Sequence, residues 1–354
     1  MFGIRNATRY DATAVIQTDA DGGDVIVCVA KGTFALGKGG KLELAEPLPL
    51  VYADEYAGKP GESGIVAGSD FALFKPGTDV IVTGSAFAPG GKAVTQMTVK
   101  LRAGSLAASL LVTGDRVWKK GLLGPSIGSP EPFREMPLVW ERAWGGAREG
   151  EGKNPGIRCD GNPVGAGLWA NDKDAIDQPL PNLEAPDDPV KNTKSRPEPA
   201  CWACVAPAWE PRRSFAGTYD AKWERDRMPL LPDDFDHAFF MQAHPALQSP
   251  KYFVGGEKIA IEGMHPKGPL SFELPKDTVE VKILLPGDKV TTHATVLDTV
   301  VLMPSEEKVT LTWRVRIPAP HPVTSVQLVQ IESREHPAPV EADADAAPAG
   351  GARG

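Results

Sequence analysis

A pentapeptide at residues 124–128 has the spacing of the nucleophile elbow of serine hydrolases. Its central residue, Ser126, has a glycine two positions away on either side, as in the G-x-S-x-G pattern. The elbow requires a strand before the serine and a helix directly after it. Residues 129–132 are Ser-Pro-Glu-Pro, and these prolines oppose a helix start. The sequence therefore favours a turn over a catalytic serine.

Two cysteines have the C-x-x-C spacing of redox and zinc motifs. Cys201 and Cys204 form the single such pair in the chain, and there is no H-x-x-x-H. A redox pair needs a helix N-terminus, and a structural zinc site needs a second pair of ligands. Pro199 and Pro207 flank the motif, and Cys159 is the other nearby thiol. We expect partly buried thiols, with no metal and no cofactor.

Three further groups of residues could carry chemistry. Residues 161–167 (GNPVGAG) suggest a phosphate loop but lack its Lys-Ser/Thr pair, so a structural turn is favoured. Residues 233–237 (DDFDH) could bind a metal or act as acid and base, but helix capping already explains aspartates there. Glu141, Asp220 and Glu224 could supply a glycosidase-like carboxylate pair, yet no spacing singles them out. With no catalytic motif assembled, we expect a protein that is not an enzyme.

The segment at residues 217–240, GTYDAKWERDRMPLLPDDFDHAFF, mixes large apolar side chains with nine charged ones. Buried charge is costly unless it is paired, whereas aromatic residues and arginines together are the usual anchors of a recognition surface. We interpret the segment as a paired structural knot, a docking surface, or both. Its candidate surface residues are Tyr219, Trp223, Arg225, Arg227 and Phe235.

A second candidate lies in MPLVWERAWGG, residues 136–146. We predict a strand over residues 138–144, stopped by the two glycines that follow. Such a strand would place Trp140, Arg142 and Trp144 on one face, because side chains alternate along a strand. These three residues could pack in the core with the arginine stacked on tryptophan, or they could belong to the docking surface.

The segments that would position these candidates alternate polar and apolar residues, which is typical of β-strands. Residues 95–102 and 106–113 alternate around Gly104-Ser105, which predicts a hairpin. Residues 308–317 alternate polar and apolar throughout, which predicts a half-buried antiparallel strand. Further strands are predicted at residues 25–34, 80–87, 270–274 and 279–285.

The middle of the chain is different. Periodicity mostly disappears over roughly residues 121–211, yet seven of the eight tryptophans fall between Trp118 and Trp223. Buried aromatic side chains must therefore hold this region against the sheets. Residues 182–200, which are charged and rich in proline, are predicted to be an exposed excursion. Helix is scarce, and one short helix is predicted near residues 234–243, started by its acidic residues.

The expected fold is mainly β, with two antiparallel, sandwich-like β-rich lobes joined by a long, loop-dense, Trp-rich region and little helix. The predicted divisions are an N-terminal β lobe at residues 1–120, an aromatic loop-rich region at 121–216 packed on the lobes, a C-terminal β lobe at 217–335 and a disordered tail at 336–354. The 37 glycines and 34 prolines together make up a fifth of the chain, against roughly 12% in average usage. This excess favours many turns.

Charge and hydropathy exclude several classes of partner. The net charge of −8 and the pI near 5.4, without a basic cluster, argue against binding of nucleic acid. The chain has no 18-residue uncharged apolar run and begins without the apolar core of a signal peptide. Four cysteines are too few for a disulfide scaffold in a chain of this size. We expect a cytoplasmic protein with no membrane partner.

Over about residues 6–332 the chain resembles a family of bacterial proteins linked to type VI secretion. The resemblance is carried by TRYDATAVIQTDADGGDVIVCVAKGTFAL near the start, VWERAWGG at 139–146 and NPVGAG at 162–167. It continues through residues 217–240, GGEKIAIEGMHPKGPLSFELP and LDTVVLMPSEEKVTLTWR. Several long segments agree in order, which makes the resemblance fairly specific.

The resemblance implies an adaptor or chaperone that holds a toxic effector without covalent chemistry and helps to load it onto the secretion spike. The partners that it implies are the secreted effector, the spike protein and its PAAR-type tip protein. Two alternatives stay open: a β-sandwich hydrolase that acts on a polysaccharide, and a structural component of the secretion apparatus.

Overall fold

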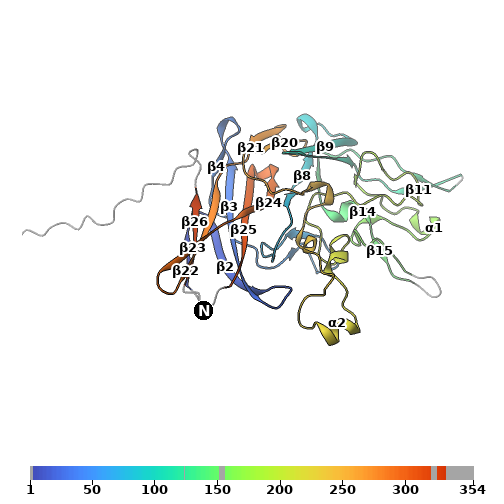
Figure 1. Cartoon of the computed structure of the whole chain (residues 1–354). Helices are drawn as coiled ribbons and strands as arrows, with labels where there is room; N and C mark the ends of the chain where they lie inside the picture. Colours follow the sequence, from blue (N-terminus) through green and yellow to red (C-terminus); the bar gives the residue numbers. More distant parts are fainter. Residues whose placement is uncertain (1–2, 123, 151–155, 320–324, 332–354) are drawn as a thin grey trace, which may run out of the picture.

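The computed structural model describes residues 3–122, 124–150, 156–319 and 325–331, and the described chain is built mainly from β-strands (Figure 1). The predicted mainly β fold is confirmed. The proposed disordered tail at residues 336–354 lies outside the described residues.

The largest sheet brings together strands from both ends of the chain. Its order is β19–β7–β24–β25–β3–β2, with β4 paired to β3. Its strands are β2 (Asp11–Thr18), β3 (Asp24–Leu36), β4 (Leu42–Leu44), β7 (Thr78–Val82), β19 (Gln248–Ser249), β24 (Val296–Met303) and β25 (Lys308–Pro318). Strand β3 pairs antiparallel with β25 along its length, and β7 pairs parallel with β24. A continuous run of β-branched residues explains why β3 is buried along most of its length.

Strand β25 confirms the strand predicted over residues 308–317 but is more buried than expected. Its polar face is covered, so Thr312 and Arg314 are buried as well. Thr312 donates to a carboxylate oxygen of Asp70 at 3.3 Å, and Arg314 Nε donates to Asp298 at 2.5 Å. Buried polar groups persist when they find partners, and alternation alone does not reveal those partners.

The second sheet has the order β18–β10–β9–β20–β21. Its strands are β9 (Gln96–Ala103), β10 (Leu106–Thr113), β18 (Leu183–Glu184), β20 (Lys258–Glu262) and β21 (Leu270–Glu273). The hairpin around Gly104-Ser105 is confirmed, since β9 and β10 pair antiparallel across it. The predicted exposed excursion at residues 182–200 is wrong in part. Leu183 and Glu184 are buried as β18, because the Glu184 carboxylate pairs with Arg116 and accepts the Val190 N–H.

The third sheet and the short strand pairs complete the framework. The sheet β1–β26–β22–β23 contains β1 (Gly3–Ala7), β22 (Thr278–Leu285), β23 (Lys289–Ala294) and β26 (Ser325–Ile331). The two-stranded pairs are β5 (Glu55–Tyr56) with β6 (Ile65–Ala67), β8 (Ser85–Phe87) with β13 (Glu135–Pro137), β11 (Trp118–Gly121) with β12 (Gly124–Ile127), β14 (Trp144–Gly145) with β17 (Ala166–Gly167), and β15 (Ala147–Arg148) with β16 (Ile157–Arg158).

Helices are short. The α-helices of the described residues are α1 (Asp172–Ala175) and α2 (Ala221–Asp226), and the 3-10 turns are Lys38–Gly40, Pro89–Gly91, Trp140–Arg142, Arg212–Ala216, His237–Phe240, Pro245–Leu247 and Pro304–Glu306.

The strand predicted over residues 138–144 is wrong. Trp140–Arg142 form a 3-10 turn, and only Trp144–Gly145 are extended in a ladder. Nδ2 of Asn162 donates to the carbonyl oxygens of both Trp140 and Trp144, at 2.8 and 3.0 Å. Residues four apart in a strand are separated by about 13 Å, so one amide group can reach both carbonyls only if the chain bends.

The helix predicted near residues 234–243 is reduced to the single 3-10 turn His237–Phe240. Asp236 caps this turn by accepting the Ala238 N–H at 2.8 Å. The chain then leaves the helical path because the N–H groups of Gln242 and Ala243 both donate to the buried Asp79 carboxylate. Both α-helices of the described residues were missed: α1, whose N-cap is Asn171, and α2, whose N-cap is Asp220.

Candidate protein-interaction surface

The acidic and aromatic segment forms an excursion from the body, residues 218–234, that closes on itself at its base. Thr218 donates its N–H and its hydroxyl to the two carboxylate oxygens of Asp234, at 2.9 and 2.7 Å. These hydrogen bonds hold the pKa of Asp234 below its ordinary value. Gly217 precedes the closure at φ +79°, and a Cβ there would lie 2.8 Å from the Asp234 carboxylate. The glycine is therefore required for the two ends of the excursion to meet.

Helix α2 stands at the far end of the excursion and projects from the body (Figure 1). Asp220 accepts the N–H groups of Lys222 and Trp223, at 3.0 and 2.8 Å, and so starts the helix. The Trp223 ring meets Tyr219 edge-on at 4.7 Å, and its Nε1 donates to the Leu230 carbonyl at 2.9 Å. Trp223 thus holds the excursion together, while Tyr219 remains 55% exposed.

Arg227 joins the excursion to the rest of the protein. Its guanidinium donates to the Ala20 carbonyl at 2.8 Å, in the turn between β2 and β3, and to the Leu231 carbonyl. It also forms an ion pair with Asp233 at 3.0 Å. Of the two interpretations offered for this segment, the structural knot describes Arg227.

Phe235 lies in a cluster of aromatic rings at the base of the excursion. Its ring centroid is 5.7 Å from those of Phe239 and Phe240 and 5.6 Å from that of His237. Burial lowers the pKa of His237. The rings of the cluster are half-buried, and their contacts with Phe235 hold the base of the excursion in place.

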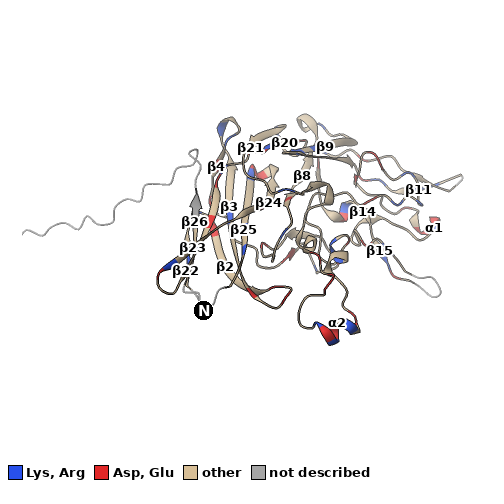
Figure 2. Cartoon of the chain, in the orientation of Figure 1, with Lys and Arg blue, Asp and Glu red and all other residues tan. Residues whose placement is uncertain are grey.

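The outer side of α2 carries charges of both signs (Figure 2). Arg225 is exposed and pairs with its neighbour Asp226 at 2.8 Å, an ion pair in water that contributes little to stability. Met228 is exposed just after the helix. We call Tyr219, Arg225 and Met228 the tip of the excursion. Its three members, an aromatic ring, a guanidinium and a thioether, are each exposed.

Trp140 and Trp144 are not surface residues, which corrects the candidate surface at residues 136–146. They are 2% and 6% exposed, and Trp140 Nε1 donates to the Cys204 carbonyl at 2.8 Å. Arg142 is half-buried and binds Asp115 and Asn182 rather than stacking on a tryptophan. The core-packing interpretation describes the two tryptophans, because the 3-10 turn directs Trp140 toward Trp209 at 5.8 Å.

The serine of the G-x-S-x-G pattern is not placed as a nucleophile. Ser126 lies in β12, which pairs antiparallel with β11, and its hydroxyl is 3.5 Å from the Lys119 carbonyl in an exposed position. The residues that follow β12, 128–132, form no helix. The local structure is a β-ribbon, so the elbow geometry is not formed.

The C-x-x-C thiols are sealed in the core. Cys201 and Cys204 are free and buried, and Cys201 Sγ lies 3.5 Å from the Leu138 carbonyl. Burial raises the pKa of Cys201 to about 12 and that of Cys204 to about 11. Thiolate is the reactive form, so neither cysteine is prepared for redox chemistry or metal binding near neutral pH.

We therefore expect Cys201 and Cys204 to resist alkylation by iodoacetamide at pH 8 in the folded protein and to react fully in denaturant. Cys159 is half-buried and is expected to react faster than either. Peptide mass spectrometry after timed quenching measures all three together. Labelling of Cys201 at the rate of Cys159 without loss of fold would contradict the burial described here.

The spare carboxylates are occupied by backbone groups. Glu141 Oε1 accepts the Gly64 N–H at 2.6 Å, and Asp220 caps α2. Glu224 is exposed on α2. The loop at residues 161–167 is held by the Asn162 side chain, which supports its interpretation as a structural turn.

Cys159 and His244 both line a hollow of about 380 Å³, which the sequence did not suggest. Burial raises the pKa of Cys159 and lowers that of His244. The imidazole Nδ1 accepts the Ala246 N–H at 3.2 Å, and a hydrogen bond with the Pro199 backbone opposes the effect of burial. Because backbone groups engage the ring, His244 is not free to take the proton of a thiol.

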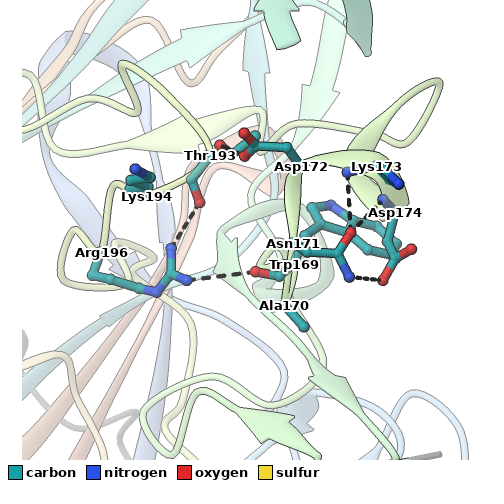
Figure 3. Close-up of a pocket in the computed structure, with 9 residues that line it drawn as sticks. All are labelled: Trp169, Ala170, Asn171, Asp172, Lys173, Asp174, Thr193, Lys194 and Arg196. Atoms are coloured by element: carbon teal, nitrogen blue, oxygen red, sulfur yellow. Dashed lines mark hydrogen bonds between the residues drawn. The ribbon is translucent and has the colours of Figure 1, made fainter. Parts of the chain in front are cut away.

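A hollow of about 650 Å³ lies beside α1 and is lined mainly by charged and polar side chains (Figure 3). Asn171 caps α1 and also donates to Asp174, while Arg196 donates to the Thr193 carbonyl at 2.9 Å. The Arg148 guanidinium lies 4.4 Å from the Trp169 ring. Asn171 and Arg196 are thus engaged by neighbouring groups, whereas Trp169 Nε1 is buried without a hydrogen-bond partner in the described residues.

The fold and the excursion define a mainly β protein that presents a projecting tip and, within the described residues, no group of three or more His, Cys, Asp or Glu side chains placed to hold a metal ion. The chain belongs to a bacterial family described as "uncharacterized protein conserved in bacteria" (DUF2169), which matches residues 21–314. Comparisons with curated proteins and with solved structures found no match. In the part of the chain that the structure describes, no helix is long and apolar enough to cross a membrane.

Proposed function

We propose that this protein is an adaptor or chaperone of type VI secretion, which binds a toxic effector without covalent chemistry and helps to load it onto the spike and its PAAR-type tip protein. The observation that carries the proposal is the tip of the excursion. Tyr219, Arg225 and Met228 are each exposed on a segment whose base is closed and tied to the β framework. Aromatic and arginine side chains are enriched among the residues that dominate binding energy.

The arrangement favours binding over chemistry. The framework below the tip is fixed by Arg227 and by the aromatic cluster around Phe235, so the tip meets a partner with little ordering cost. A chaperone stabilises a cargo only while it is bound, and the spike then competes for the same cargo by offering better contacts.

The test is an affinity pull-down of the tagged protein from its native host, with bound proteins identified by mass spectrometry. We expect a toxin-like protein together with spike or tip components. The double variant Tyr219→Ala/Arg225→Ala is expected to lower their recovery at least tenfold and to stay folded, because neither side chain is buried. Trp223→Ala is less informative, since it removes the hydrogen bond to Leu230 that shapes the excursion.

The matched control is Val254→Ala, which truncates a side chain that is 77% exposed outside the excursion and is expected to leave recovery unchanged. Equal loss in both variants would contradict a role for the tip. A partner with fixed stoichiometry in the assembled particle would favour a structural component. A bait that recovers no such partner while secretion is active would contradict the adaptor and favour the polysaccharide hydrolase.

A further inference from the structure

Strand β10 has one paired edge and one partly open edge. Its inner edge pairs with β9 from Leu106 to Thr113, whereas its outer edge pairs with β18 only at Leu111 and Val112. The sheet that contains β9 and β20 lies at one margin of the molecule (Figure 1). The remaining residues of β10 therefore form a sheet edge.

The hydrogen bonds at the end of β10 show which backbone groups face outward. Thr113 donates its N–H to the Asn182 carbonyl, on the β18 side, at 2.8 Å. Alternate residues of an antiparallel strand present both backbone groups to the same edge. Leu111, Ser109 and Ala107 therefore also face outward. Among the described residues, β18 pairs with Leu111, but nothing pairs with the backbone of Ser109 or Ala107.

A proline ends the pairing of β18. Because Glu184 is opposite Leu111, continuing the register would place Pro186 opposite Ser109. Proline has no N–H to give to the Ser109 carbonyl. The chain turns instead, with the Asp188 N–H donating to the Ala185 carbonyl at 3.2 Å. Pro186 thus ends the pairing of β18 with β10, and Ser109 and Ala107 are left without a backbone partner in the described residues.

Space for side chains lies on both faces of this edge. A hollow of about 430 Å³ is lined by small and apolar groups, including Ala108, Leu110, Ala200 and Trp202. A second hollow, of about 380 Å³, includes Arg102 in its lining and also borders the edge. Side chains of an added strand would alternate between two such faces.

The charges differ between the two faces of the edge: Arg102 and the paired Lys100 border one hollow, whereas the hollow beside Trp202 is bordered by carboxylates, which favour a basic partner side chain there. Strand β10, LAASLLVT, carries no charged residue, although exposed edges are usually protected by lysine, proline or a covering segment. Beside it, Asp187, Asp188 and Glu198 are exposed and form no ion pair within the described chain. Lysine or arginine on an incoming segment would complement them.

We propose that the open edge of β10 binds an extended segment of a partner polypeptide, which adds to the sheet as a strand antiparallel to β10 and in line with β18. The backbone of the segment pairs with Ser109 and Ala107. Its small or apolar side chains enter the hollow beside Trp202, and a basic side chain lies near Asp187 or Glu198. The backbone hydrogen bonds give affinity and the hollows give specificity, as in other cases of strand addition. This site is separate from the tip and does not depend on the function proposed above.

The test begins with a random ten-residue peptide library displayed on phage and selected in parallel on the wild-type protein, Ser109→Pro and Ser109→Ala. Proline at position 109 removes an outward N–H and leaves the ladder with β9 intact, so the variant is expected to fold. Ser109→Ala keeps the N–H and is the matched control. We expect peptides rich in alternating small or apolar residues, with lysine or arginine, to be enriched on wild type and Ser109→Ala but not on Ser109→Pro.

One selected peptide is then synthesised with and without backbone N-methylation at each central residue, and its binding to the wild-type protein is measured by calorimetry. We expect methylation at alternate residues, those whose N–H faces β10, to weaken binding at least tenfold, and methylation at the intervening residues to have little effect. This measurement holds even if Ser109→Pro is unstable. Absence of peptides enriched on wild type over Ser109→Pro, or N-methylation effects without alternation, would overturn the proposal. A dimer in sedimentation that Ser109→Pro dissociates would overturn it in favour of a second copy of this chain.

Discussion

Replacing Asp79 with alanine is expected to lower the free energy of unfolding by about 3–5 kcal/mol, the effect of breaking a buried ion pair by removal of one partner. The Asp79 carboxylate is 0% exposed and lies 2.7 Å from Lys75 Nζ. It also accepts the N–H groups of Gln242 and Ala243, at 2.8 and 3.1 Å. The variant leaves a buried ammonium and two backbone donors without this acceptor.

The measurement is equilibrium unfolding in guanidinium chloride, followed by tryptophan fluorescence. The control is Glu262→Ala, which breaks an exposed pair with Lys100 of 3.3 Å and is expected to cost less than about 1 kcal/mol. If Asp79→Ala shifted the midpoint no more than Glu262→Ala, the carboxylate would not be the organising group of this region. A second check is the variant Lys75→Met, which removes the cation but keeps both backbone hydrogen bonds and is expected to cost less than Asp79→Ala.

The contacts of Asp79 also explain why the helix predicted at residues 234–243 is shorter than expected. It lies in β7, which overlaps the strand predicted at residues 80–87, although that prediction missed the break between β7 and β8. The partners of Asp79, Gln242 and Ala243, are more than 160 residues away in the chain. The helical signal at residues 234–243 is local and real, since Asp236 does cap a turn. It fails to extend because a distant carboxylate binds the next backbone groups.

The strands whose signals are contained within them were predicted well. The hairpin of β9 and β10 depends on alternation and on a two-residue turn, both of which are local. The strand at residues 308–317 was recognised for the same reason. The bend at Trp140 was missed because Asn162, which holds it, belongs to another loop, and the open edge of β10 depends on Pro186 in a segment whose pairing no local pattern shows.

The candidate surface was predicted in composition but not in detail. The mixture of aromatic and charged residues at 217–240 allowed two interpretations, of which the structural knot describes Arg227 and Trp223, while the docking surface stays a prediction. Arg227 and Trp223 hold the excursion together, while Tyr219 and Arg225 are exposed at its tip. Residue type gives the same signal in both cases, because arginine and tryptophan serve buried pairing and recognition equally well.

The second large effect is expected at Trp140. Trp140→Ala should cost about 3–5 kcal/mol, the range found when a buried tryptophan or phenylalanine is truncated. The ring is 2% exposed, meets Trp209 edge-on at 5.8 Å, and donates its Nε1–H to the Cys204 carbonyl. Trp140→Phe keeps much of the packing and loses the donor, so it should cost about 1–3 kcal/mol, which is the desolvation cost of a buried acceptor left unpaired.

Unfolding in guanidinium chloride separates these cases, with Tyr219→Ala as the matched control. Tyr219 is exposed, and its truncation should change the free energy of unfolding by less than about 0.5 kcal/mol. The order Trp140→Ala, then Trp140→Phe, then Tyr219→Ala follows from the burial of the ring and from its hydrogen bond to the Cys204 carbonyl. A cost for Trp140→Ala as small as that for Tyr219→Ala would return Trp140 to the candidate binding surface. The expected order instead confines that surface to the tip, because a side chain that the core needs cannot also be offered to a partner without unfolding its surroundings.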